Sequence, residues 1–240
     1  MNEKILNTLM HLFAIIAPAQ GNESDRRRVV EAFLRPQLNQ EGVNAYLRIF
    51  DAYYAEAQHR LKKGNEARRN AAISVRIIKI CFDIGAQLTL NQKIIVLVQL
   101  LEYCRSDAAE VSSTELEFII TAAEGFNINP DDYQLIQQFV MSSRSEVPES
   151  SQVLIIDSDR KSSYEKTHHI VNNTLRGQVR VLNLPQADML FVRSFGTGEL
   201  LLSGQLRHED KVYLFERGAS LKFMSSKPIY YSEVIRQFLD

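Results

Sequence analysis

A short polar turn at residues 106–115 carries three carboxylates, Asp107, Glu110 and Glu115, between two apolar stretches of helical spacing. Oxygen ligands of this kind suit hard cations such as Ca²⁺ and Mg²⁺. The turn is shorter than an EF-hand loop and lacks the central glycine of that loop. Two interpretations stay open at this point. The turn is a divalent-cation site, or Glu115 completes a capping box with Ser112 and the other two carboxylates are solvated.

Side chains that could carry covalent or metal-assisted catalysis form no known motif. The sequence has no glycine-rich phosphate loop, no Gly-x-Ser-x-Gly elbow, no His-Glu-x-x-His and no Cys-x-x-Cys. His168 and His169 are adjacent, so in a strand they would point to opposite faces and could not bind one metal together. A catalytic function would need one of them in a cleft with Asp157 or Asp159. The sequence therefore predicts a non-catalytic region.

Charge is segregated along the first half of the chain, although the formal net charge is only −1. Residues 60–79 contain seven positive side chains and one negative, whereas residues 102–132 contain eight negative and one positive. The basic stretch suits an acidic partner or lipid headgroups, but it is also typical of a solvated helix face. It contains no aromatic residue on which a base could stack, so nucleic acid is not an expected partner.

Residues 1–141 have the apolar spacing of a helical bundle. Two capping boxes, Thr89–Gln92 and Ser112–Glu115, indicate helix starts. Asn129 followed by Pro130 indicates a third, because asparagine caps well and proline suits the first helical position. Apolar residues recur three and four positions apart after each start. We expect six or seven helices and no strands in this half.

The second half has a different pattern. Residues 142–151 are polar, with one proline, and predict a linker between two domains. Residues 152–240 contain short apolar runs separated by turn residues such as Ser203-Gly204. Seven or eight such strands predict a small β-sandwich or barrel, with residues 231–240 as a connector or helix start. The expected fold class is α+β in two domains, an all-α bundle followed by an all-β sandwich.

The N-terminus and the cysteines bear on the compartment. Residues 5–17 are rich in apolar side chains and end at Ala17-Pro18-Ala19, which superficially matches a signal peptide. Glu3 beside Lys4, and polar residues within the run, favour an amphipathic helix. Cys81 and Cys104 lie in apolar helical runs, which indicates buried thiols in a reducing environment. No segment reaches the ~20 apolar residues that span a bilayer. We therefore expect a cytoplasmic protein.

The turn and its neighbours resemble the TerB-like (tellurite-resistance B) helical domain. The pattern Ala-Asp-Gly-x-Val-Ser-x-x-Glu-Leu-Glu is similar to residues 106–117, and Phe-Asn-Ile-Asn matches residues 126–129. Ala108 replaces the glycine of that pattern, and one residue is inserted before Val111. The resemblance implies metal binding, which here would fall to Asp107, Glu110 and Glu115.

The second half resembles a degenerate forkhead-associated (FHA) sandwich. In certain large bacterial ABC transporter ATP-binding proteins, such a region follows a TerB-like domain and precedes the nucleotide-binding cassette. The resemblance lies in residues 200–205, 212–215, 218–220 and 228–232, and the phosphothreonine motif of FHA domains is absent. It implies a non-catalytic N-terminal regulatory region, held at the inner face of the membrane through its parent transporter. Its partners would be other transporter domains or a further protein. The alternative is a stand-alone Ca²⁺- or Mg²⁺-responsive protein of the TerB type.

Overall fold

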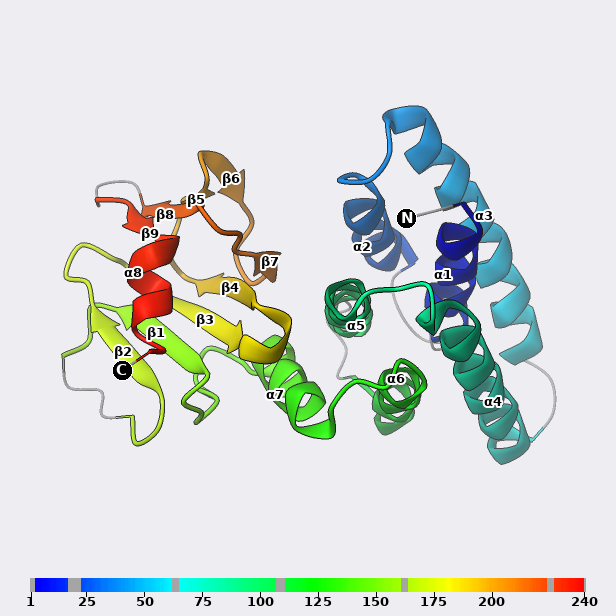
Figure 1. The fold of residues 1–240 in the computed structure, drawn as a ribbon. Helices are drawn as coiled ribbons and strands as arrows, with labels where there is room; N and C mark the ends of the chain where they lie inside the picture. The colour runs from blue at the N-terminus through cyan, green and yellow to red at the C-terminus, as the bar shows by residue number, and fades with distance from the viewer. Residues whose placement is uncertain are drawn as a thin grey trace. The chain divides into compact units, whose positions relative to one another are not determined.

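Most helices precede the strands along the chain, which gives an α+β layout in two units (Figure 1). The computed structural model describes residues 3–16, 23–61, 65–106, 111–160, 164–223 and 227–239. Contacts divide the chain into compact units at Met1–Gln134 and Leu135–Asp240. The predicted fold class is confirmed at this level. No helix in the described ranges is long and apolar enough to cross a membrane.

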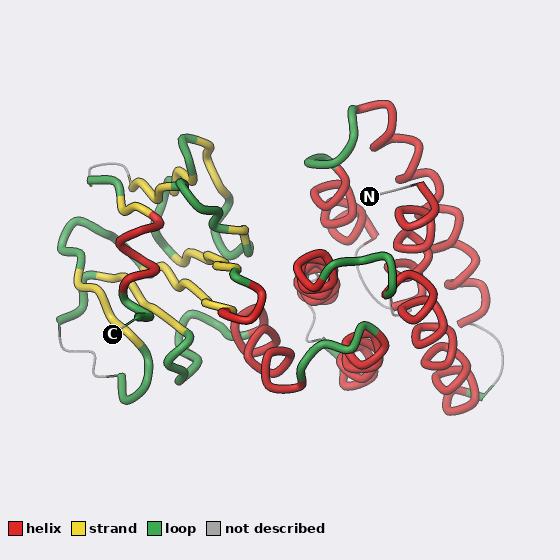
Figure 2. The backbone as a smooth tube through the Cα atoms, viewed as in Figure 1, coloured by secondary structure: helices red, strands yellow, loops and turns green. Residues whose placement is uncertain are grey.

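The helical unit contains the helices α1 to α6 and the start of α7 (Figure 2). Their bounds are α1 Glu3–Ile16, α2 Glu23–Leu34, α3 Gln40–Leu61, α4 Glu66–Gly85, α5 Leu90–Arg105, α6 Ser113–Gly125 and α7 Pro130–Met141. Helix α1 packs against α3 and α4, and α4 packs against α6. The predicted number of helices is thus confirmed for the described residues.

Helix α1 is buried on nearly all sides, which explains why its sequence reads as an apolar run. Leu9, Leu12 and Phe13 are fully buried. The Phe13 ring contacts the Tyr103 ring of α5 edge-on, with centroids 5.5 Å apart, and Tyr103 in turn contacts Phe50 of α3. Aromatic pairs of this geometry add to the apolar burial that joins three helices into one core.

The predicted helix starts are confirmed. Thr89 and Ser112 each form a complete capping box, with Gln92 and Glu115 as the respective partners. The side chain of Asn129 accepts a hydrogen bond from the backbone N–H of Asp131 at the start of α7. These side chains pair N–H groups that the helix itself leaves without acceptors.

The second unit contains two sheets whose facing sides share one hydrophobic core. Sheet order is β2-β1-β3-β4-β7 in the first sheet and β6-β5-β8-β9 in the second. The strands are β1 Val153–Asp157, β2 His168–Val171, β3 Gln178–Leu184, β4 Met189–Phe195, β5 Leu200–Leu202, β6 Gln205–Arg207, β7 Tyr213–Leu214, β8 Ser220–Phe223 and β9 Ile229–Tyr230, followed by helix α8 Tyr231–Arg236. Val181 and Val192 of the first sheet and Leu200 and Leu221 of the second belong to the shared core.

The structure describes nine strands where the sequence pattern predicted seven or eight, and β2 and β6 are the two least evident from their sequences. Both are edge strands, and their residues are largely half-buried or exposed. An edge strand with no fully buried face has little apolar alternation, so its sequence resembles a loop. His168 and His169 both lie in β2, at an edge of the first sheet.

The opposite face of the first sheet is also buried, and it carries Arg180 of β3. The Arg180 side chain donates hydrogen bonds to the Ser142 hydroxyl at 3.0 Å and to the carbonyls of Arg144 at 2.6 Å and Glu146 at 3.0 Å. Its Nε donates to the side chain of Gln178 at 2.7 Å. Thus every arm of a fully buried guanidinium has an acceptor, as burial of a charge requires.

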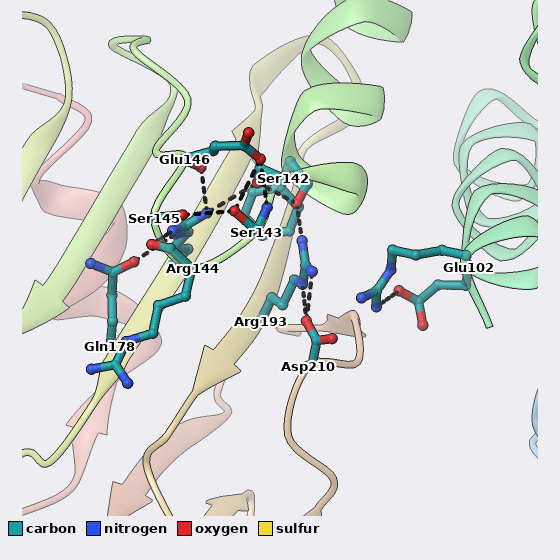
Figure 3. A network of polar contacts seen from close by, with 12 residues as sticks. Glu102, Ser142, Ser143, Arg144, Ser145, Glu146, Gln178, Arg193 and Asp210 are labelled. Atoms are coloured by element: carbon teal, nitrogen blue, oxygen red, sulfur yellow. Dashed lines mark hydrogen bonds and ion pairs between the residues drawn. The ribbon is translucent and has the colours of Figure 1, made fainter. Parts of the chain in front are cut away.

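A second buried guanidinium, Arg193 of β4, lies directly across from Arg180. It donates to the carbonyl of Phe139 at 2.7 Å, in the last turn of α7, and it is ion-paired with Asp210 (Figure 3). Both guanidinium carbons lie 4.5 Å from the centre of the Phe195 ring. A cation beside a helix C-terminus is favourable, because carbonyls there lack partners and carry partial negative charge. Burial and the neighbouring Arg193 charge lower the pKa of Arg180 to about 10.

The segment predicted as a linker is therefore held against the sheet along part of its length. Arg180 binds three of its residues, and the buried Pro148 accepts a hydrogen bond from Thr167 through its carbonyl. Ser143 and Glu146 bond to each other in a capping arrangement. The two compact units divide within α7, ahead of the predicted linker at residues 142–151.

We expect Arg180→Met to destabilise the second unit by about 3 to 5 kcal/mol. The change removes the hydrogen bonds from the charged guanidinium to Ser142, Arg144 and Glu146, and bonds of a charged group contribute about 1.5 to 3 kcal/mol each. Removal of a charge beside Arg193 offsets part of the loss. Urea unfolding of residues 1–240, followed by circular dichroism, measures the difference.

Arg176→Met is the matched control, because Arg176 is exposed in the turn before the same strand. It should change the free energy of unfolding by less than about 0.5 kcal/mol. Equal unfolding curves for Arg180→Met and Arg176→Met would contradict the structural role of Arg180.

Candidate functional site

The structure places the three predicted metal ligands unequally. Asp107 and Glu110 lie outside the described residues. Glu115 lies in the first turn of α6 and is buried, with 4% of its surface exposed. The grouping of all three carboxylates therefore stays a prediction.

The carboxylate of Glu115 accepts hydrogen bonds from several donors of the protein itself. One oxygen accepts from the Ser112 backbone N–H at 2.8 Å and from the Ser112 hydroxyl at 2.9 Å. The other accepts from Arg26 of α2 at 3.3 Å, and the Cys104 thiol of α5 also bonds to Glu115. A carboxylate offers about four lone-pair sites, so these four donors use its capacity. A cation at Glu115 would have to displace some of them.

The Arg26–Glu115 ion pair joins three helices in the interior. Arg26 is buried, and its guanidinium carbon lies 5.5 Å from the centre of the Tyr103 ring. Burial, followed by the Glu115 charge, raises the pKa of the adjacent Cys104 thiol. Burial also raises the pKa of Cys81, to about 12. Both thiols are buried, as the sequence predicted, and they are protonated at neutral pH.

The histidine pair is separated as expected, and one member meets an aspartate. His169 hydrogen bonds to Asp157 of the neighbouring strand at 2.9 Å, and Gln178 donates to the other oxygen of Asp157 at 3.2 Å. His168 instead lies against the ring of Phe238. Gln178 is bonded to Arg180, so the His169–Asp157 pair continues the polar network that anchors residues 142–146. Neither His168 nor His169 lines the cleft that lies in the helical unit.

A cleft of about 140 Å³ lies between α1, α3 and α4. Three arginines line it, Arg60 at the end of α3 and Arg69 and Arg76 on α4. The two α4 residues are seven positions apart, which places them on one side of the helix. The rest of the lining is His11, Ile15, Tyr53, Glu56, Ala57, Ala72 and Ile73. The cleft therefore combines an apolar wall with a concentration of positive charge.

His11 and Tyr53 form the aromatic part of this wall. Their rings are stacked, with centroids 4.5 Å apart and planes 18° from parallel. The Tyr53 hydroxyl donates to the side chain of Asn7 at 3.0 Å, which fixes the ring. Burial and the charge of Arg76 lower the pKa of His11 from 6.5 to about 4, so His11 is neutral at pH 7.

The cleft carries a net positive charge. Glu56 is the one acid among the described lining residues, and it is ion-paired with Arg60. Three arginines and one glutamate leave a charge of about +2 while His11 is neutral. The basic stretch at residues 60–79 indicated these arginines in the sequence. Nothing in the sequence indicated His11 or Tyr53, because their partners come from a different helix.

We expect Glu115→Gln to destabilise the helical unit by about 3 to 5 kcal/mol, because it leaves the Arg26 charge buried without its counter-charge. Urea unfolding measured by circular dichroism gives the difference. Glu117→Gln, on the exposed side of the same helix, should stay within about 0.5 kcal/mol of the parent chain.

Thermal melting of the parent chain and of Asp107→Ala tests the metal prediction. A melting temperature of the parent chain that rises with millimolar Ca²⁺, but not in Asp107→Ala, would support a cation site in the turn. An unchanged stability in Glu115→Gln would instead contradict the role given to the buried ion pair.

No protein-family model matches the chain, and no curated protein or solved structure matches it. The resemblance to TerB-like and FHA-like domains thus stays a prediction that rests on the residues quoted above.

Proposed function

We propose that residues 1–240 form a non-catalytic interaction and regulatory region. The observation that carries this proposal is a stripe of large apolar side chains on the exposed side of α4. Val75, Ile78 and Phe82 expose 67%, 47% and 78% of their surface. Their spacing of three and four residues places them on one helix face, where they are side by side. An exposed apolar group of this kind is typical of a protein interaction surface.

The partner is best described as an amphipathic protein segment with acidic residues. Arg68 and Lys79 are exposed, and helical spacing places them beside the apolar stripe. An acidic partner would complement these charges, while Phe82 would supply the aromatic anchor that interfaces commonly use. The buried side of the same helix, which includes Ile77 and Ile84, belongs to the core. The stripe is therefore additional to what the fold requires.

The resemblance noted in the sequence extends this proposal to a parent protein. On that basis the region belongs to a large ABC transporter ATP-binding protein, and its partner is another domain of that transporter. The buried ionic groups support a non-catalytic role, because Glu115, Arg180 and Arg193 are all occupied by structural hydrogen bonds. Stoichiometric ATP hydrolysis by residues 1–240 would contradict this assignment.

The binding prediction uses a designed amphipathic peptide of about 18 residues, leucine on one face and glutamate on the other, long enough to form a helix. We expect the parent chain to bind the labelled peptide in a fluorescence anisotropy titration. Phe82→Asp should weaken binding at least about 30-fold, since loss of an aromatic anchor costs about 2 kcal/mol or more.

Leu206→Asp is the matched control, because Leu206 is an exposed leucine of the other unit, with 59% of its surface accessible. It should bind the peptide like the parent chain. A lysine version of the peptide should bind much more weakly than the glutamate version. Equal binding of both peptides, or equal loss in both variants, would contradict the proposed surface.

The transporter assignment makes a separate prediction about the native protein. An antibody raised against residues 1–240 should detect a membrane-associated species far larger than the 27.5 kDa of this chain. Fractionation followed by immunoblotting measures both properties. A freely soluble species of 27.5 kDa would remove the transporter from the proposal and leave the interaction surface to be judged by the peptide titration.

A further inference from the structure

We propose that the arginine-lined cleft of the helical unit binds a small organic phosphate or carboxylate with a compact apolar body. The cleft lies on the side of α4 that carries Arg69 and Arg76, next to the exposed stripe but separate from it. The inference is independent of the proposed protein partner, because none of Val75, Ile78 and Phe82 lines the cleft.

The size and walls of the cleft suit an apolar group no larger than one ring. Its volume of about 140 Å³ is close to the roughly 150 Å³ of an engineered apolar cavity that accepts benzene. Ile15, Ala57 and Ile73 provide aliphatic contacts, and the stacked His11–Tyr53 pair provides an aromatic wall. Small-molecule sites commonly combine such a lining with a few polar groups that orient the ligand.

The charge of the cleft selects an anion. Arg76 is half-buried, and the one acid of the described lining, Glu56, is paired with Arg60 on α3. A guanidinium can donate two parallel hydrogen bonds to a carboxylate or a phosphate, and such bonds are stronger when water is partly excluded. An anionic head placed at Arg76 would thus compensate a charge that the lining itself leaves without an acid.

The position of His11 supplies a reporter inside the cleft. Burial is the largest cause of its low pKa; the charges of Arg76 and Arg60 lower the pKa further, and the charge of Glu56 raises it. Tyr53 covers one face of the ring. A bound anion adds negative charge near His11, so it should raise the pKa of His11 from about 4 towards the ordinary value of 6.5. A ligand that binds elsewhere would leave this pKa unchanged.

The test uses residues 1–240 with phenyl phosphate and benzoate as probes, and phenol and inorganic phosphate as comparisons. Calorimetric titration should show at least one of the two organic anions binding at least about tenfold more tightly than either comparison. NMR titration of His11, assigned with His11→Gln, should show the upward pKa shift in the presence of that anion. Binding as tight for phenol, or no shift at His11, would overturn the proposal.

Variants on one helix separate the cleft from general electrostatic attraction. Arg76→Gln should weaken binding at least about tenfold, whereas Arg68→Gln, exposed on another side of α4, should change it less than about twofold. Arg76→Lys keeps the charge but loses the planar fork, and it should fall between the two. Equal losses in Arg76→Gln and Arg68→Gln would overturn the assignment.

Phe82→Asp separates this inference from the proposed function. It should leave the affinity for phenyl phosphate unchanged while it weakens peptide binding at least about 30-fold. A chain that binds the peptide but neither anion would retain the interaction surface and overturn the cleft. The reverse result would retain the cleft alone.

Discussion

A buried guanidinium needs hydrogen-bond acceptors in place of water. The second unit has to meet this requirement for two guanidiniums that lie next to each other. Arg180 and Arg193 occupy opposite positions on neighbouring strands, and both are buried. Their desolvation is unfavourable by several kcal/mol for each ion unless hydrogen bonds replace water. The carbonyl of Phe139 and those of Arg144 and Glu146 provide these bonds. The end of α7 and the segment after it are thereby fixed to the sheet, and the two sheets can share one core on the other side.

The helical unit meets the same constraint with an ion pair. Arg26 of α2 is buried against Glu115 of α6, and the Tyr103 ring lies beside it. A single residue, Glu115, thus caps its own helix and compensates a charge from another helix. This double role explains why the residue fits both interpretations of the sequence. A carboxylate after a serine at capping distance is common, and nothing in that spacing shows which cation it meets.

Local features of the fold were predictable, because they depend on residues close together in the sequence. The capping boxes at Thr89 and Ser112 and the α+β layout follow from short-range patterns. Contacts across long separations were not predictable in this way. Arg26 meets Glu115 across 89 positions, and Arg180 occupies a polar position of an alternating strand that normally faces water. The polar residues 142–151 suggested a linker for the same reason, since the donor that their acceptors meet, Arg180, comes from β3.

Helix α4 carries two surface features that the core does not include, an exposed apolar stripe and part of an arginine-lined cleft. Its buried side supplies Ile77 and Ile84 to the core, as periodicity predicts. A second side carries Arg76 into a cleft whose one described acid, Glu56, is paired with Arg60, and a third exposes Phe82 to solvent. Exposed aromatic surface is typical of an interaction site, and a cleft with three arginines and one glutamate keeps a net positive charge. Elsewhere in the described residues, the buried charges of Arg26, Arg180 and Arg193 are met by an ion pair or by hydrogen bonds. The apolar stripe and the cleft lie on two sides of one helix. This arrangement argues for two different ligands, an apolar partner on one side and an anion on the other.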